Sequence, residues 1–163
     1  KFLIIFLFNF FCIIIYMNIL KHQSIQFIVM VIIGILFNPM NVLAFEFNHL
    51  YLSLTLFYGG LLMASNMVWA HEIVHYLAHG KFNWKIFIIG IIMSIAITLF
   101  LLREQFLVND NQWLKRMISH HSTALTTSKK IALRTKNEKV RKLANEIIET
   151  QEREIKQMRD LIL

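Results

Sequence analysis

Charged residues are scarce in the first 102 positions of this 163-residue chain. Only four of its 17 lysines and arginines, and two of its 10 aspartates and glutamates, precede Arg103. Hydrophobic residues make up 56% of the chain and the mean hydropathy is +0.54, whereas an ordinary soluble domain has about 45 to 50% apolar residues. This lack of charge excludes a soluble globular domain as the class of the whole chain and predicts a membrane protein.

Cysteine and proline each occur once. Cys12 has no second cysteine to pair with, which excludes a disulfide within the chain and leaves the redox compartment open. Pro39 follows Asn38 near the end of an apolar segment, and because proline lacks a backbone donor we expect it to kink or close a helix there. No internal repeat or low-complexity linker interrupts the chain.

Apolar segments predict a transmembrane helical region over residues 1–103, with helices near 2–20, 25–45, 48–79 and 84–102. Such segments are long enough to cross a hydrocarbon core of about 30 Å. They predict an all-α polytopic membrane protein with three to four transmembrane helices in a lipid bilayer. The first segment is either a retained helix or a cleaved signal. Gly80 is a natural C-cap for the third helix.

The tail, residues 104–163, carries 12 basic and 8 acidic residues, and Arg103 directly before it adds a thirteenth basic residue. These charges are interleaved at helical spacings. This pattern favours anionic lipid headgroups and predicts no nucleic-acid partner, because the basic residues form no continuous stripe. Two amphipathic arms, near 111–135 and 138–162, predict a helical hairpin. Two helices bury too little apolar surface to be stable alone. We therefore expect the hairpin to pack on a second copy, on a partner membrane subunit or on the membrane half.

The first arm contains Met-Ile-Ser-His-His, in which Met117, His120 and His121 share one side of a helix at i, i+3 and i+4. Thioether and imidazole ligands suit copper, whereas imidazole with carboxylate suits zinc or iron. Counting from the turn places His121 and Glu154 at similar heights on the two arms. The spacing is also compatible with a core methionine beside two solvated or locally bonded histidines. The second arm offers three further ligands on one face: Gln151, Glu154 and Met158.

These arms resemble the domain of unknown function 305 family, whose members carry Met-Ile-x-His-His followed by small residues and then a second helix with a Val-Arg-x-Leu-Ala pattern. The chain has MISHHSTALTTS at 117–128 and VRKLANEIIETQEREIKQM at 140–158. The upstream stretches NHLYLSLTLFYGGLLMASNM and LLREQFLVND resemble the membrane-anchored branch. The resemblance implies a ferritin-like fold and, for some members, copper binding in the periplasm. Ser119 stands where the family often has proline. By position, the resemblance implies six metal-site residues: Met117, His120, His121, Gln151, Glu154 and Met158.

The stretch HEIVHYLAH at 71–79 contains a His-Glu-x-x-His pattern, with Glu72 placed like the general base of a zinc protease. A catalytic zinc needs a third protein ligand, and His79 lacks the metzincin spacing, so an intramembrane metalloprotease is only the third hypothesis. A ladder with four-residue steps is a second, weaker candidate for copper or zinc: Met63, Met67, His71, His75 and His79. Alternatively, the histidines mark a helix end in the headgroups or in water.

The predicted topology separates the two candidate sites. If all four segments cross, the ladder and the tail lie on opposite faces of the membrane. By analogy with the family, we expect the tail to be exoplasmic or periplasmic. The leading hypothesis is a membrane-anchored transition-metal binding protein, with copper first and zinc as the alternative, that serves metal storage, resistance or delivery. The alternative is a structural membrane protein, without enzymatic activity, that forms homo-oligomers through its hairpin.

Overall fold

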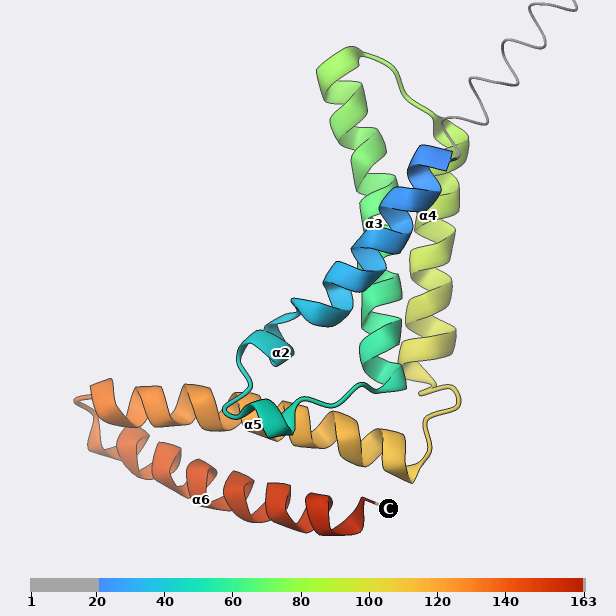
Figure 1. Cartoon of the computed structure of the whole chain (residues 1–163). Helices are drawn as coiled ribbons and strands as arrows, with labels where there is room; N and C mark the ends of the chain where they lie inside the picture. Colours follow the sequence, from blue (N-terminus) through green and yellow to red (C-terminus); the bar gives the residue numbers. More distant parts are fainter. Residues whose placement is uncertain (1–20, 163) are drawn as a thin grey trace, which may run out of the picture.

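In the computed structural model, which describes residues 21–162, every regular element is helical. The helices form an upright bundle and, across one end of it, a hairpin (Figure 1). The all-α class is therefore confirmed for the described residues, while the predicted segment 2–20 lies outside them. The bundle contains a helix over residues 21–36, α2 (Pro39–Val42), α3 (Leu54–His79) and α4 (Trp84–Ala96). The hairpin contains α5 (Asp110–Arg134) and α6 (Glu138–Leu161).

The Asn38-Pro39 pair closes the first described helix. The Oδ1 atom of Asn38 accepts hydrogen bonds from the backbone amides of Met40 at 2.9 Å and Asn41 at 3.1 Å, which caps the short α2. Pro39 occupies the first turn of α2, where its missing donor is not needed. The segment predicted as one helix over 25–45 therefore contains the end of one helix, at residue 36, and a second short helix that ends at Val42.

α3 begins at Leu54, so the prediction of a start near Asn48 was wrong. Ser53 is the N-cap, and its Oγ accepts from the amide of Leu56 at 3.2 Å. Residues 44–53 instead form a loop with one 3-10 turn, η1 (Phe47–His49), which packs against α5. Docking on a distant helix prevails here over the local helical pattern. At the other end the C-cap prediction is confirmed, because Gly80 has a φ of 67° in the left-handed region.

Small residues bring the bundle helices into close contact. A Cβ atom added to Gly34 would lie 2.9 Å from the Cα atom of Gly60, and Gly90 lets α4 approach the backbone of α3 equally closely. The Oγ atoms of Ser94 and Ser65 form a hydrogen bond of 3.0 Å between α4 and α3. Such contacts are typical of membrane helices, because lipid provides no hydrophobic drive for helix association.

Two stretches, Lys21–Val42 and Trp84–Arg103, are long and apolar enough to cross a membrane. The second combines α4 with a π-helical continuation, η2 (Ile97–Arg103), and its 20 residues rise about 30 Å. α3 packs against both α4 and η2 and is about 39 Å long by its helical rise. Two helices that could cross a membrane are thus shown.

The hairpin arms lie within one residue of their predicted bounds. Asn109 and Asn137 cap the two arms, each accepting a backbone hydrogen bond at 3.0 Å through its side chain. α5 also packs against α2, η1 and α3. Of the supports expected for the hairpin, the chain's own membrane half is therefore present. The hairpin core consists of Leu114, Ile118, Leu125, Ile155 and Met158.

Candidate functional site

His121 and Glu154, which the residue count places at similar heights, are in contact. The Nδ1 atom of His121 lies 3.1 Å from the Oε2 atom of Glu154, linking α5 to α6. The prediction that these two side chains are neighbours is confirmed. The buried Nδ1 atom has no hydrogen-bond partner, however. The two groups are therefore close without being aligned for proton donation.

Burial determines the protonation state of His121. It lowers the pKa of His121 below the ordinary value, because the charged imidazolium is disfavoured away from water. Glu154 acts in the opposite direction and raises the pKa, and His120 lowers it further. His121 is accordingly a neutral imidazole at physiological pH, the form that can bind a metal.

The other predicted ligands of the hairpin are not gathered around this pair. Met158 is buried in the hairpin core, and Met117 packs against that core. His120 is exposed, and its ring centroid lies 5.8 Å from that of His121. Gln151 is half-buried on α6. Both thioethers thus contribute to packing, as the alternative interpretation of the spacing allowed. Within residues 21–162, no three His, Cys, Asp or Glu side chains form a group able to hold a metal.

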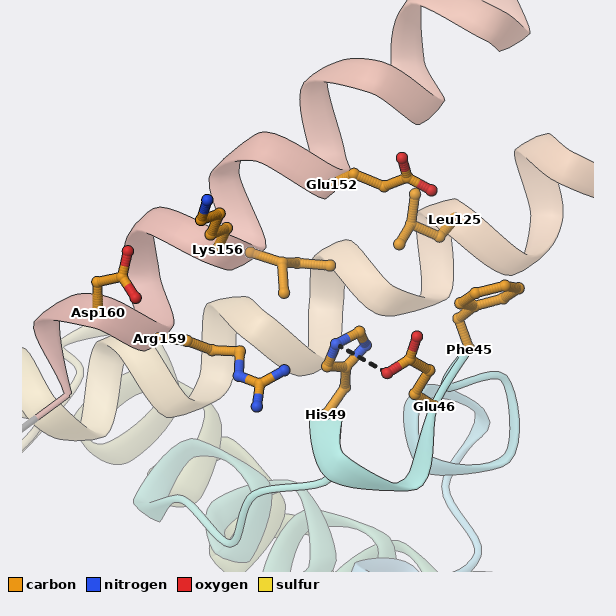
Figure 2. Close-up of a pocket in the computed structure, with 9 residues that line it drawn as sticks. Phe45, Glu46, His49, Leu125, Glu152, Lys156, Arg159 and Asp160 are labelled. Carbon is orange, nitrogen blue, oxygen red and sulfur yellow. Dashed lines mark ion pairs between the residues drawn. The ribbon is translucent and has the colours of Figure 1, made fainter.

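A cavity that the sequence did not predict lies between η1, α5 and α6 (Figure 2). Its volume is about 370 Å³. Two basic and three acidic side chains surround it beside apolar ones, so it presents no field of one sign to a charged ligand. Its lining residues are Phe45, Glu46, His49, Leu125, Glu152, Ile155, Lys156, Arg159 and Asp160.

His49 is the buried polar group of this cavity, with 5% of its surface exposed. Its Nδ1 atom lies 3.0 Å from the Oγ atom of Ser122, and its Nε2 atom lies 3.8 Å from the Oε2 atom of Glu46 (Figure 2, dashed line). Burial lowers the pKa of His49, Glu46 raises it and Arg159 lowers it. The outcome is a neutral imidazole that joins the loop to α5.

Two serines of the Met-Ile-Ser-His-His-Ser stretch fasten the loop 44–53 to α5. Ser122 accepts a hydrogen bond from the amide of Phe45 at 2.7 Å, and Ser119 donates one to the carbonyl oxygen of His49 at 2.9 Å. Both serines are buried, and their small side chains let the loop approach the helix backbone. We name His49, Ser119 and Ser122 the loop clamp.

Ser122, His49 and Glu46 follow the order of a serine-hydrolase triad, but the arrangement does not suit catalysis. A nucleophile needs access to substrate, a base within hydrogen-bond reach and an orienting acid. Ser122 has no exposed surface and already accepts from the Phe45 amide. The carboxylate is 3.8 Å from the ring. The contacts of the clamp are those of a structural network.

No local pattern could have revealed the loop clamp. Ser122 is 73 residues from His49 and 77 from Phe45, so only the folded chain brings them together. The single available signal was the pair of serines at i, i+3 on the first arm, which gives α5 a small, polar stripe. That stripe fits a close backbone approach, but it does not identify the segment that approaches.

The last turns of α3, residues 71–79, carry the histidines of the ladder and lie at the end of that helix remote from the hairpin (Figure 1). The rings of His71 and His75 stack with centroids 6.2 Å apart, and those of His75 and His79 lie 4.9 Å apart. The Nδ1 atom of His75 is 2.9 Å from the carbonyl oxygen of Lys81, so this ring holds the turn after α3. The two methionines, Met63 and Met67, are exposed on the bundle.

Glu72 has a structural partner of its own. It is buried, and its Oε2 atom accepts from the amide of Asn83, the N-cap of α4, at 3.1 Å. The carboxylate therefore joins the ends of α3 and α4. It is not grouped with two histidines around a metal position in the part of the chain that the structure describes.

Comparisons with known proteins place this architecture in a family. Residues 102–162 match the family described as Domain of unknown function (DUF305). The chain is 34% identical over 125 residues to "Uncharacterized protein L153" of Acanthamoeba polyphaga mimivirus, and the alignment covers 77% of this chain and 81% of that protein. No solved structure matches. Because the alignment is longer than the hairpin, the similarity includes part of the membrane half. The chain thus belongs to the same family as this viral protein and carries a DUF305 domain at residues 102–162.

Proposed function

We propose that this chain is a structural membrane protein that holds its DUF305 hairpin against one face of a bilayer. The observation that carries the proposal is the loop clamp, in which buried His49, Ser119 and Ser122 fix α5 to the loop between α2 and α3. Buried polar groups are costly unless they are fully paired. A paired, buried network of this kind holds the hairpin in one position relative to the bundle, which a flexible tether would not do.

In this proposal the stretch Lys21–Val42, α3, and α4 with η2 all cross the membrane. Many exposed side chains of α3 are apolar, and a lipid environment stabilises such a surface. The hairpin is exoplasmic or periplasmic, following the family analogy. Examples of these exposed side chains on α3 are Phe57, Met63, Met67, Ile73 and Val74.

Association with other chains would use surfaces other than the apolar face of α6. Ile155 and Met158 of that face are buried against α5, so joining two chains through it would require the hairpin to open. Homo-oligomers or partner membrane subunits remain part of the proposal through the exposed surfaces of the hairpin and bundle.

Substituting the clamp tests this proposal. Ser122→Ala leaves the Phe45 amide and the His49 ring without their partner, at a cost of about 1 to 3 kcal/mol. In reconstituted full-length protein we expect faster hydrogen exchange in the loop 44–53 and in α5. Ser128→Ala, a buried serine of α5 outside the clamp, is the matched control. Equal exchange in the two variants would contradict a docking role.

A second measurement separates the structural proposal from a metal-dependent one. If the hairpin is held by packing and the clamp, the purified protein should contain no stoichiometric metal, and chelators should leave its thermal midpoint unchanged. Stoichiometric copper or zinc, together with a midpoint that falls on chelation, would reject the purely structural function.

Transition-metal binding is the second candidate function, and one observation favours it. His121 offers a neutral imidazole beside the Glu154 carboxylate, 3.1 Å away, and its Nδ1 atom has no hydrogen-bond partner. Imidazole with carboxylate suits zinc or iron better than copper. With both thioethers in or against the core, we place zinc before copper for storage or delivery at this pair, completed by exposed His120 or by a second chain.

The metal proposal is tested by titrating Cu(I) and Zn(II) into wild-type protein and into His120→Ala/His121→Ala. Loss of two imidazoles from a small site should weaken binding at least about tenfold, by analogy with ligand-shell substitutions. His75→Ala/His79→Ala is the parallel variant, which keeps the hairpin intact and changes the ladder, so that a loss of affinity there would assign the binding to the ladder instead. Equal affinity of wild type and the hairpin variant would eliminate the site.

A further inference from the structure

The connection between the bundle and the hairpin, residues 104–109, has a strained backbone that is held in place. Gln105 and Leu107 have φ angles of 48° and 55°, the only non-glycine residues among those described with positive φ. Side chains with a Cβ are disfavoured in this region. Two bonds to α3 keep the connection from relaxing: Tyr58 donates to the carbonyl of Phe106 at 2.7 Å, and Thr55 donates to the side chain of Gln105 at 3.1 Å.

This strained connection presents apolar side chains outward. Leu107 is 71% exposed, and Phe106 is more than half exposed. Trp113, in the first turn of α5, is also about half exposed. Exposure of a leucine and a phenylalanine to water is unfavourable, and the strained backbone of this loop is unfavourable as well. Such a surface indicates that the loop binds an apolar partner.

The second connection, residues 44–53, lies at the same end of the bundle (Figure 1) and also carries exposed apolar side chains. Phe47 is 92% exposed and Leu52 is also largely exposed, although the loop backbone is clamped to α5. The backbone amide of Leu54 donates to the side chain of Gln112 at 2.8 Å, which joins the first turns of α3 and α5, the helices that follow the two connections. Both connections therefore carry unpartnered apolar groups at the junction of bundle and hairpin.

Basic residues accompany these apolar groups. Arg103 ends the stretch that is able to cross a membrane, and Lys115 and Arg116 follow Trp113 on α5. Aromatic side chains beside lysine and arginine at the end of an apolar span are typical of the boundary between acyl chains and phosphate headgroups. A second protein chain would not require this order of span, basic residue, aromatic residue and basic pair.

From these observations we infer that the two connections form a lipid-binding rim, in which Phe47, Leu52, Phe106, Leu107 and Trp113 enter the bilayer interface and α5 lies along the headgroups. This inference rests on the proposed membrane crossing of the bundle. Arg103, Lys115 and Arg116 would contact lipid phosphates. In this arrangement the loop clamp and the rim together hold the hairpin at a defined depth relative to the bilayer.

Site-specific labels test the rim in the full-length chain. Three variants in a Cys12→Ser background each carry one cysteine, at position 107, 143 or 92, which is labelled with an environment-sensitive fluorophore. The labelled proteins are then reconstituted into vesicles of zwitterionic and anionic phospholipid. Leu107→Cys probes the rim. Leu143→Cys probes an exposed leucine of α6, and Ile92→Cys probes an exposed face of α4. Nitroxide-bearing lipids quench labels in the bilayer, and iodide quenches labels in water.

We expect the label at 107 to be quenched by nitroxide lipids several-fold more than the label at 143, and by iodide several-fold less. Lipid quenching at 92 with iodide quenching at 107 would leave the membrane crossing intact and overturn the rim. Absence of lipid quenching at both 92 and 107 would overturn the rim together with the crossing. Protection of 107 from both quenchers would show that protein covers it, which also overturns the lipid proposal.

Discussion

The bundle and the hairpin are both helical but are held together by different chemistry. In the bundle, glycines such as Gly34, Gly60 and Gly90 let backbones meet, and isoleucines, leucines and phenylalanines point outward. In the hairpin, Ile118 and Ile155 are buried while charged side chains form pairs outside, such as Lys129 with Glu152 at 2.7 Å. Apolar side chains thus cover much of the outer surface of the bundle, whereas the hairpin buries an apolar core between its two arms.

In the proposed membrane topology, this difference reflects the surroundings of each region. Water drives the apolar side chains of the hairpin together, whereas lipid is as apolar as leucine and leaves close backbone packing and interhelical hydrogen bonds to hold the bundle. The loop clamp lies where these environments meet. Its buried hydroxyl and imidazole groups join the loop 44–53 to α5.

The largest effect should come from the hairpin core. Ile118→Ala removes a fully buried side chain, and we expect a loss of about 3 kcal/mol in the free energy of unfolding. Leu133→Ala, at a side chain that is 84% exposed, should change it by less than about 0.5 kcal/mol. Chemical unfolding of the reconstituted protein, followed by helix circular dichroism, measures both. Similar losses in the two variants would mean that the core assignment is incorrect.

An intermediate effect is expected in the bundle from two adjacent glycines. A Cβ atom at Gly60 would lie 3.0 Å from the carbonyl oxygen of Val31, whereas one at Gly59 has nothing within 4 Å. Gly60→Ala should therefore destabilise the bundle by about 2 kcal/mol through overpacking. Gly59→Ala should be neutral or slightly stabilising. Unfolding in mixed detergent micelles gives both values, and an equal response would break the proposed contrast in packing.

The smallest effect concerns pH at the junction. The pKa values of His49 and His121 are lowered from 6.5 in the folded protein, so the unfolded chain binds more protons around that pH. Stability contributed by the neutral rings is thus present above about pH 6.5 and is lost as the pH falls through the lowered values. The thermal midpoint should fall on acidification, and His49→Gln/His121→Gln should flatten the curve. A wild-type midpoint that rises on acidification would contradict the burial of these rings.

Much of the fold could be predicted because its signals are local. The bounds of α5 and α6 follow from amphipathic spacing, and Gly80 marks the end of α3. The contact of His121 with Glu154 followed from counting residues along two antiparallel helices. Copper binding stays a prediction. The thioethers expected to support it lie in or against the core, because the same spacing serves packing and ligation.

Sequence alone determined the helical class, the separation of apolar and charged halves, and the hairpin, because each depends on periodicity, caps and composition within a few turns of helix. Only the tertiary structure decided that residues 44–53 leave the helix, that His49 is buried and that Ser119 and Ser122 hold it. Those outcomes depend on contacts across 70 or more residues, where the free energy of docking exceeds local helix preference. The tertiary structure also decided the conformations of the connections at 44–53 and 104–109. Hydrogen bonds between their backbone groups and side chains of distant helices stabilise conformations that the local sequence does not favour.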